Sequence, residues 1–250
     1  TGRGLKATLS ADGNLNIGMP SGYNAEGKLH VYNGAAGKSW ATDSADQLIV
    51  ENSSSVAIDI RTPNADQGQI LFSDAAARSR GRIGYYHAED YMYFDTAGGL
   101  RLKIDQNGAV TKPYQPAFLA KPTSPQNNMG TSNSTINFGT EIYDQGSDFS
   151  SNTFTAPVTG KYSFNAVIRL DQISTDANYI EIKIVTSNRN YHWLMDPDGL
   201  DSNPAYWNGQ ISCLADMDAG DTAKVFYNQS GGSTTTDVST ESHFSGFLAC

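Results

Sequence analysis

The chain has 250 residues and a net charge of −9, with 24 Gly, 13 Tyr and many Ser, Thr, Asn and Asp residues. This composition favours short strands joined by turns, and the absence of a basic excess excludes nucleic acid as an expected partner. No apolar run reaches the ~20 residues needed to span a bilayer; we expect no membrane insertion, and we take the chain as the C-terminal part of a longer protein.

The first 19 residues contain one half of an internal repeat. Residues 4–15 align with residues 99–110, so that the Gly, Leu and other apolar positions coincide at a constant offset of 95 residues. Both halves contain a strong hairpin signal, Asp12-Gly13 in the first and Asn107-Gly108 in the second. Two ordinary hairpins can agree by chance, or one 95-residue unit can repeat along a longer shaft. We take residues 1–19 as the end of a preceding shaft repeat.

Residues 20–112 contain many short segments that alternate apolar with polar side chains. Such segments indicate half-buried strands, and they bury little apolar surface in a single copy. Three copies packed about an axis would cover each other's apolar rows and hide the strand edges. We therefore predict a trimeric, β-rich shaft module. The segments are Val56–Ile60, Ile70–Phe72, Ile83–Tyr85, Tyr91–Tyr93 and Leu100–Ile104.

Residues 71–110 resemble shaft modules of bacteriophage tail fibres. They contain a strand, a small-residue turn, the run Arg80-Gly81-Arg82-Ile83, a Tyr, an acidic turn and a Gly-Leu strand, in the order typical of those modules. The resemblance implies a virion location outside the host cell. We expect the cluster of Arg78, Arg80 and Arg82 to lie in a solvated turn or to pair with Glu89 and Asp90 of another copy, rather than to bind a ligand.

Residues 113–117 form the predicted boundary between the shaft module and a C-terminal head. Pro113 and Pro116 favour an extended, stiff connector. Residues 118–250 then contain about ten candidate strands at the spacing typical of a β-sandwich. Besides Tyr162–Leu170, they include Ile180–Ile184, Tyr191–Met195, Gln210–Ala215, Ala223–Tyr227 and Phe244–Leu248.

Two motifs in the head resemble the signature of the complement C1q-like family. The chain departs from the signature twice. The gap between Phe149 and Phe154 is two residues shorter than in the family, and Ala166 stands where an aromatic residue is usual. The resemblance covers residues 117–249 and implies a trimeric jelly-roll head of the tumour-necrosis-factor type without enzymatic activity. The matching residues are Phe138, Asp144, Phe149, Phe154, Gly160, Tyr162 and Phe164, followed by Gly220, Asp221, Val225 and Phe244–Leu248.

Tyr206 and Trp207 are the candidate ligand-binding aromatics, with Asn203 and Asn208 beside them. Aromatic rings stack on the apolar faces of sugars, and amide groups bond to hydroxyls. The alternative is that both rings cover the core or the trimer seam. Alternation along Tyr191-His192-Trp193 places His192 on the opposite face from its neighbours, so we expect packing there.

Calcium is the one cofactor that the sequence suggests, and only weakly. Asp196, Asp198 and Asp201 have the spacing of a calcium loop, but the closing Glu is missing and Pro197 is atypical, which favours a solvated turn. His30, His87, His192 and His243 are scattered and form no metal pattern. The two cysteines do not make a disulfide framework: Cys213 is typical of a small core residue, and Cys250 is the last residue.

These observations predict an all-β protein with a trimeric shaft module followed by a jelly-roll head. The expected function is attachment of a viral tail fibre to a host-cell glycan or outer-membrane component. One alternative is a structural, trimer-forming module with the receptor site elsewhere. A polysaccharide-degrading tailspike is less favoured, because no paired-carboxylate or Ser/His/Asp pattern is present. A trimer would have a charge of three times −9, or −27, so attachment to a negatively charged envelope would depend on short-range contacts.

Overall fold

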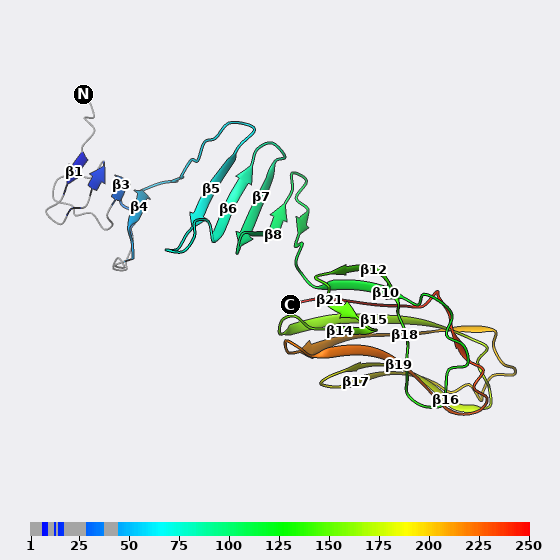
Figure 1. The fold of residues 1–250 in the computed structure, drawn as a ribbon. Helices are drawn as coiled ribbons and strands as arrows, with labels where there is room; N and C mark the ends of the chain where they lie inside the picture. The colour runs from blue at the N-terminus through cyan, green and yellow to red at the C-terminus, as the bar shows by residue number, and fades with distance from the viewer. Residues whose placement is uncertain (1–6, 10–12, 14, 18–28, 38–44) are drawn as a thin grey trace. The chain divides into compact units, whose positions relative to one another are not determined.

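A computed structural model of the protein describes residues 7–9, 13, 15–17, 29–37 and 45–250. All regular structure in these residues is β-strand, which confirms the predicted all-β class (Figure 1). The described residues contain no helix that could cross a membrane. The chain divides into two units, Thr1–Leu71 with Ile83–Tyr91, and Phe72–Arg82 with Met92–Cys250.

The first unit contains a four-stranded sheet and two further strands. Within the sheet, β1 and β2 are antiparallel, whereas β2, β3 and β4 run parallel. The strands of this unit are β1 (Ala7–Leu9), β2 (Leu15–Ile17), β3 (Leu29–Asn33) and β4 (Leu48–Asn52), together with most of β5 (Gln67–Phe72) and β6 (Gly81–Tyr86).

The two halves of the internal repeat fold as hairpins of the same register. Leu9 pairs with Leu15 across β1 and β2, and Ile104 pairs with Val110 across β8 (Gly99–Ile104) and β9 (Val110–Thr111). These pairs are offset by the same 95 residues as the sequence alignment. Gly13 and Gly108, in the two turns, have φ values of 77° and 82°, a conformation that favours glycine. Residues 4–6, 10–12 and 14 of the first half lie outside the described residues.

Most strands predicted between residues 20 and 112 are confirmed, including β5, β6, β8 and β7 (Tyr91–Thr96). The strand predicted at Val56–Ile60 is wrong for the single chain, because this segment has no regular structure. The arginine cluster pairs within the chain: Arg80 Nε lies 3.0 Å from Asp74 Oδ2, and Arg82 pairs with Asp95.

The connector before the head contains a turn, which corrects the predicted extended form. The backbone N–H of Gln115 donates to Lys112 O at 3.1 Å, and Pro113 lies second in this turn, where its fixed φ suits the geometry. The first strand of the head, β10 (Ala117–Lys121), begins immediately after Pro116.

The C-terminal domain is a sandwich of two antiparallel sheets. The first sheet has the order β12-β10-β21-β15-β18, with β20 beside β15; the second has the order β13-β14-β19-β16-β17, with β11 beside β19. Their strands are β11 (Ser134–Thr135), β12 (Thr140–Gln145), β13 (Phe149–Ser150), β14 (Thr153–Thr155), β15 (Gly160–Asp171), β16 (Ala177–Thr186), β17 (Asn190–Met195), β18 (Tyr206–Met217), β19 (Thr222–Gly231), β20 (Asp237–Val238) and β21 (His243–Leu248).

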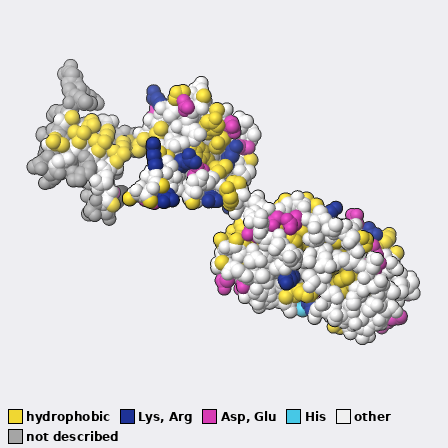
Figure 2. All heavy atoms as spheres, in the orientation of Figure 1, with side chains coloured by type: hydrophobic (Ala, Val, Ile, Leu, Met, Phe, Trp, Pro, Cys, Tyr) yellow, Lys and Arg dark blue, Asp and Glu magenta, His cyan; other side chains and the backbone are white. Residues whose placement is uncertain are grey.

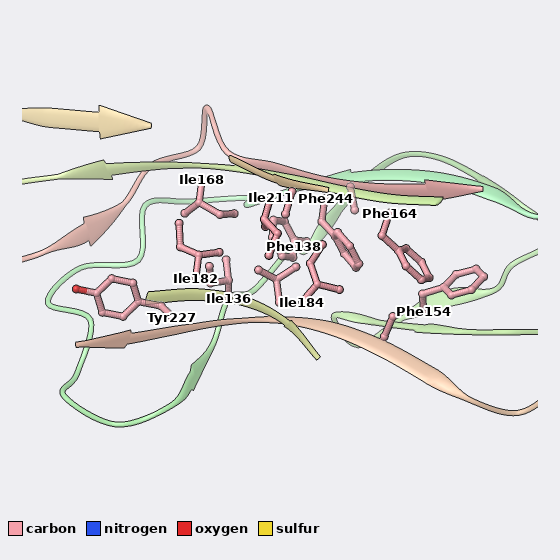
Figure 3. Close-up of a cluster of buried hydrophobic side chains, with 14 of the residues drawn as sticks. Ile136, Phe138, Phe154, Phe164, Ile168, Ile182, Ile184, Ile211, Tyr227 and Phe244 are labelled. Carbon is pink, nitrogen blue, oxygen red and sulfur yellow. The ribbon is translucent and has the colours of Figure 1, made fainter. Parts of the chain in front are cut away.

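The core of this domain lies between the two sheets and is rich in phenylalanine and isoleucine (Figure 3). Alternate residues of β15 and β16 are buried, which is the period-two pattern of strands with one face on a core. The Phe118 ring stacks on Phe149 at 4.7 Å and on Phe154 at 5.1 Å between centroids. The aromatic residues of the first sequence motif are therefore core residues.

Candidate functional site

The long pairing of β15 with β18 defines two ends of the C-terminal domain. It joins Gly160 to Met217 at one end and Asp171 to Tyr206 at the other, over twelve residues. The chain enters at the first end, because Ala117 of β10 pairs with Phe247 of β21, and Phe247 pairs with Ser163 of β15. We call this the connector end and the other the distal end; from Ser163 to Asp171 they are separated by about 26 Å at ~3.3 Å per residue.

Three loops close the distal end of the domain. The backbone N–H of Gln172 donates to Ala205 O at 3.1 Å, and the Gln172 side chain donates to Asp237 Oδ2 at 2.8 Å. These bonds join the loop after β15 to the loop before β18 and to the start of β20. The polar loop between β19 and β20 is exposed from Gly231 to Thr235.

Tyr206 and Asn208 lie on the face of the first sheet that points away from the core, which we call the outer face. Both side chains are exposed, and Tyr206 is 69% accessible. Register places Tyr206 opposite Asp171 and Asn208 opposite Arg169 on the neighbouring strand. Arg169 Cζ lies 5.5 Å from the Tyr206 ring centroid, and Arg169 Nε donates to Asp171 Oδ1 at 2.9 Å. The four side chains form one polar, aromatic cluster.

Trp207 lies on the opposite side of β18 from Tyr206. It pairs with Leu170, whose side chain is fully buried, and it is 41% exposed at the edge of the sheet. Because β18 begins at Tyr206, the two aromatics are consecutive strand residues and point in opposite directions. Their rings therefore lie on different sides of β18 and do not form one common stacking surface.

Asn203 holds the distal loops together. Its Oδ1 accepts hydrogen bonds from the backbone N–H and the hydroxyl of Thr175, at 2.9 and 2.6 Å. This arrangement occupies the side-chain oxygen that was a candidate for ligand contact. Arg169 and Asp171, in contrast, were not singled out in the sequence, since only the long-range strand register brings them beside Tyr206.

The three aspartates of the calcium candidate are exposed in the loop between β17 and β18. Asp196 Oδ1 accepts the Asp198 backbone N–H at 3.1 Å, and Leu200 N donates to Pro197 O at 3.1 Å, so the loop is closed by its own bonds. Across the part of the chain that the structure describes, no group of three or more His, Cys, Asp or Glu side chains is placed to hold a metal ion. The segment forms the turn that the sequence favoured over a metal site.

A hollow with a volume of about 510 Å³ lies at the connector end. None of the predicted site residues lines it. Its walls include Tyr114, Pro116, Pro157, Val158 and Leu248, so it is mainly an apolar recess beside the connector.

On the face seen in Figure 2, the C-terminal domain carries few charged side chains and several small hydrophobic groups. Several large apolar side chains on the first sheet and on the adjoining edge of the sandwich are exposed. The first sheet contributes Tyr143 and Phe247 on its outer face, both 51% exposed. The edge strands β17 and β18 contribute Leu194 at 62% and Leu214 at 60%.

Cys213 and Cys250 are both free thiols in this structure. Cys213 pairs with Phe164 on β15 and packs against the core, and burial raises the pKa of its thiol to about 11. The core position predicted for Cys213 is therefore confirmed. Tyr191 and Trp193 also pack against the core, whereas His192 is exposed and bonds to Glu181, as alternation predicted.

Comparison with known proteins shows that the C-terminal half of the chain matches one protein family. The C1q domain model matches residues 117–249. The globular domain of zebrafish complement 1qA protein is similar in structure, with 17% identity and a TM-score of 0.39, covering 54% of this chain and 98% of that chain. Murine APRIL at pH 8.0 is similar with 12% identity, a TM-score of 0.39 and the same coverage. A search of curated protein sequences gave no match.

Proposed function

The chain belongs to the C1q domain family, whose jelly-roll sandwich is the fold of residues 117–249, and from this premise we propose that it is part of a homotrimeric viral tail fibre that attaches to the host-cell surface. In this proposal the C-terminal domain is the receptor-binding head, and the distal end makes the contact. The observation that supports it most directly is the exposed Tyr206 cluster at the end farthest from the connector.

Homotrimer formation is supported by the family and by the exposed apolar side chains. Domains of this family commonly form homotrimers. Phe247, Tyr143 and Leu214 lie on the outer face of the first sheet, whereas Leu194 lies on β17, the edge strand of the second sheet. Exposed apolar side chains gathered on one sheet face fit an interface between copies of this chain.

The side chains on the outer face are apolar near the connector end and polar at the distal end. At the level of Ser163 it presents Phe247 and Leu214, whereas at the distal end it presents Arg169, Asp171, Asn208 and Tyr206. The apolar part suits the seam between copies, and the polar part suits a hydrated ligand. We therefore assign contact between copies to the connector half of the face, and ligand binding to the distal end.

A carbohydrate is the ligand class that this cluster fits best. A sugar ring stacks its apolar face on an aromatic side chain, while amide, carboxylate and guanidinium groups bond to its hydroxyls. Tyr206, Asn208, Asp171 and Arg169 supply all of these groups within one surface. Each single contact is weak, and three copies of the site in one trimer would multiply the affinity for a dense glycan surface.

The assignment to a viral fibre rests on residues 71–110 and their resemblance to fibre shaft modules. The matching hairpins at residues 7–17 and 99–111 fit a repeating shaft. Of the neighbouring carboxylates Asp144 and Asp148, the first accepts the backbone N–H groups of Asp148 and Phe149. A carboxylate that closes a turn in this way favours attachment over the cleavage of polysaccharide.

Binding of the purified chain to host cells and to a glycan array tests the proposal. We expect a trimer by light scattering that binds, and ~5- to 30-fold weaker binding after Tyr206→Ala, since one stacking contact contributes ~1–2 kcal/mol. Tyr114→Ala removes an exposed tyrosine at the connector and is the matched control. A trimer that binds nothing would leave the chain a purely structural role; a stable monomer would contradict the proposal altogether.

A further inference from the structure

Residues 55–61 of the first unit, which we call the unpaired segment, have the sequence of a β-strand without its structure. Val56, Ile58 and Ile60 alternate with Ala57, Asp59 and Arg61, and the three β-branched side chains are 55%, 67% and 44% exposed. β-Branched residues at every second position strongly favour a strand with one apolar face. In this chain, that face is in contact with solvent.

From Val56 to Arg61, the backbone of the unpaired segment has no hydrogen-bond partner in its own chain, whereas Ser55 O accepts the side chain of Asn52 at 2.8 Å. Between residues 56 and 61, which the structure describes in full, no backbone hydrogen bond is formed. By contrast, β4, a few residues earlier, pairs with β3 along all five of its residues. Immediately after the segment, the buried hydroxyl of Thr62 also has no hydrogen-bond partner. Unpaired backbone groups along an apolar row are a template for pairing with another strand.

The charges of the unpaired segment favour its association with the same segment of another copy of the chain. Asp59 and Arg61 are both exposed and are paired with each other, with Arg61 Nε 2.6 Å from Asp59 Oδ2. The segment therefore has no net charge, although the whole chain has a charge of −9. Copies of this segment can approach one another without the repulsion that the rest of the chain would impose, and Asp59 of one copy can pair with Arg61 of the next.

We propose that the unpaired segment becomes a β-strand of the shaft by pairing with a second copy of this chain. The inference rests on the proposed function, because a trimeric head would hold three copies of the segment at a high effective concentration. Pairing would satisfy the backbone groups of residues 56–61 and cover Val56, Ile58 and Ile60. A seven-residue strand is of ordinary length for a sheet.

Hydrogen–deuterium exchange on the full chain tests this pairing. We expect the amides of residues 56–61 to exchange at least ~100-fold more slowly than in an unstructured peptide, although the single chain offers them no acceptor. Ile58→Asp places a charge in the apolar row and should return these amides to unprotected rates, with the trimer mass unchanged. Ala57→Asp places the same charge on the alternate face and should preserve the protection.

The oligomeric mass separates failure of this inference from failure of the proposed function. A trimer whose amides 56–61 exchange as fast as in a free peptide would overturn the pairing and leave the function intact. A monomer would overturn both. Slow exchange in a monomeric sample would show that the partner lies within the chain, and would overturn the pairing between copies.

Discussion

The backbone N–H of Phe149 donates to Asp144 Oδ2 at 2.9 Å, so a polar residue of the first sequence motif holds an aromatic one in place. The other oxygen, Oδ1, accepts the N–H of Asp148 at 3.1 Å. The carboxylate thus closes the turn between β12 and β13. It also sets the entry of Phe149 into the core, where its ring stacks on Phe118. The five-residue spacing in the motif is the length of this turn.

We expect Asp144→Ala to destabilise the domain by roughly 2–4 kcal/mol, because two backbone N–H groups lose a charged acceptor. Asp144→Asn retains one acceptor oxygen and should cost about half as much. Urea unfolding followed by tryptophan fluorescence measures both. Equal stability of the alanine variant and the unaltered protein would show that water replaces the carboxylate at no cost.

Gly246→Ala should be destabilising by ~1–3 kcal/mol or more, since a methyl group there would overlap two core rings. A Cβ at this position would lie 2.5 Å from Phe164 Cδ1 and 2.9 Å from Phe118 Cε1. Gly199→Ala is the matched control, because a Cβ at Gly199 has no atom within 4 Å. Thermal unfolding of the two variants compares them; a fall in Tm of the same size for both would contradict the packing argument.

The two thiols should differ in reactivity. Burial raises the pKa of Cys213 to about 11, so almost none of it is thiolate at pH 8, whereas Cys250 is exposed. A chromogenic disulfide reagent should therefore titrate one thiol per native chain and two per unfolded chain. Cys250→Ser should abolish the rapid reaction. Rapid labelling of that variant would place Cys213 in contact with solvent.

The Asp148 carboxyl should weaken the fold at neutral pH. Partial burial and then the charge of Asp144 raise its pKa above 3.8 in the folded state. The folded state therefore holds this proton more tightly than the unfolded state. The free energy of unfolding falls as the pH rises from the pKa of the unfolded state through that of the folded state. Asp148→Asn should raise the Tm by ~1–2 °C at pH 7 and leave it unchanged at pH 3. A larger gain in Tm at pH 3 than at pH 7 would mean that the ionised Asp148 carboxylate stabilises the fold, and would contradict this prediction.

The sequence was sufficient for the strands of the head, because their alternation reflects burial of one face in the same chain. Tyr162 to Leu170 and Ile180 to Ile184 were predicted as strands and form parts of β15 and β16. The aromatic residues of the first motif are in the core for the same reason. In this domain, the apolar residues that alternate along the sequence of a strand are the ones that the structure buries.

The candidate site was only partly predictable, because it depends on which strands pair. Tyr206 and Asn208 were singled out by composition, but Arg169 and Asp171 join them only through the β15–β18 register. Tyr206 and Trp207 were proposed together as ligand-binding aromatics, but both belong to β18, whose alternation sends their side chains to opposite faces. At Val56–Ile60 the alternation is that of a strand, but a strand also needs a neighbour, which this chain alone does not supply.

The ladder between β15 and β18 also has a mechanical consequence. Antiparallel hydrogen bonds lie perpendicular to the strands, so a pull between the connector end and the distal end of the domain is applied along the strands and across the bonds. All twelve paired residues of each strand then bear the load together in shear, instead of opening one after another. If the domain attaches at its distal end as proposed, this ladder would resist the resulting tension.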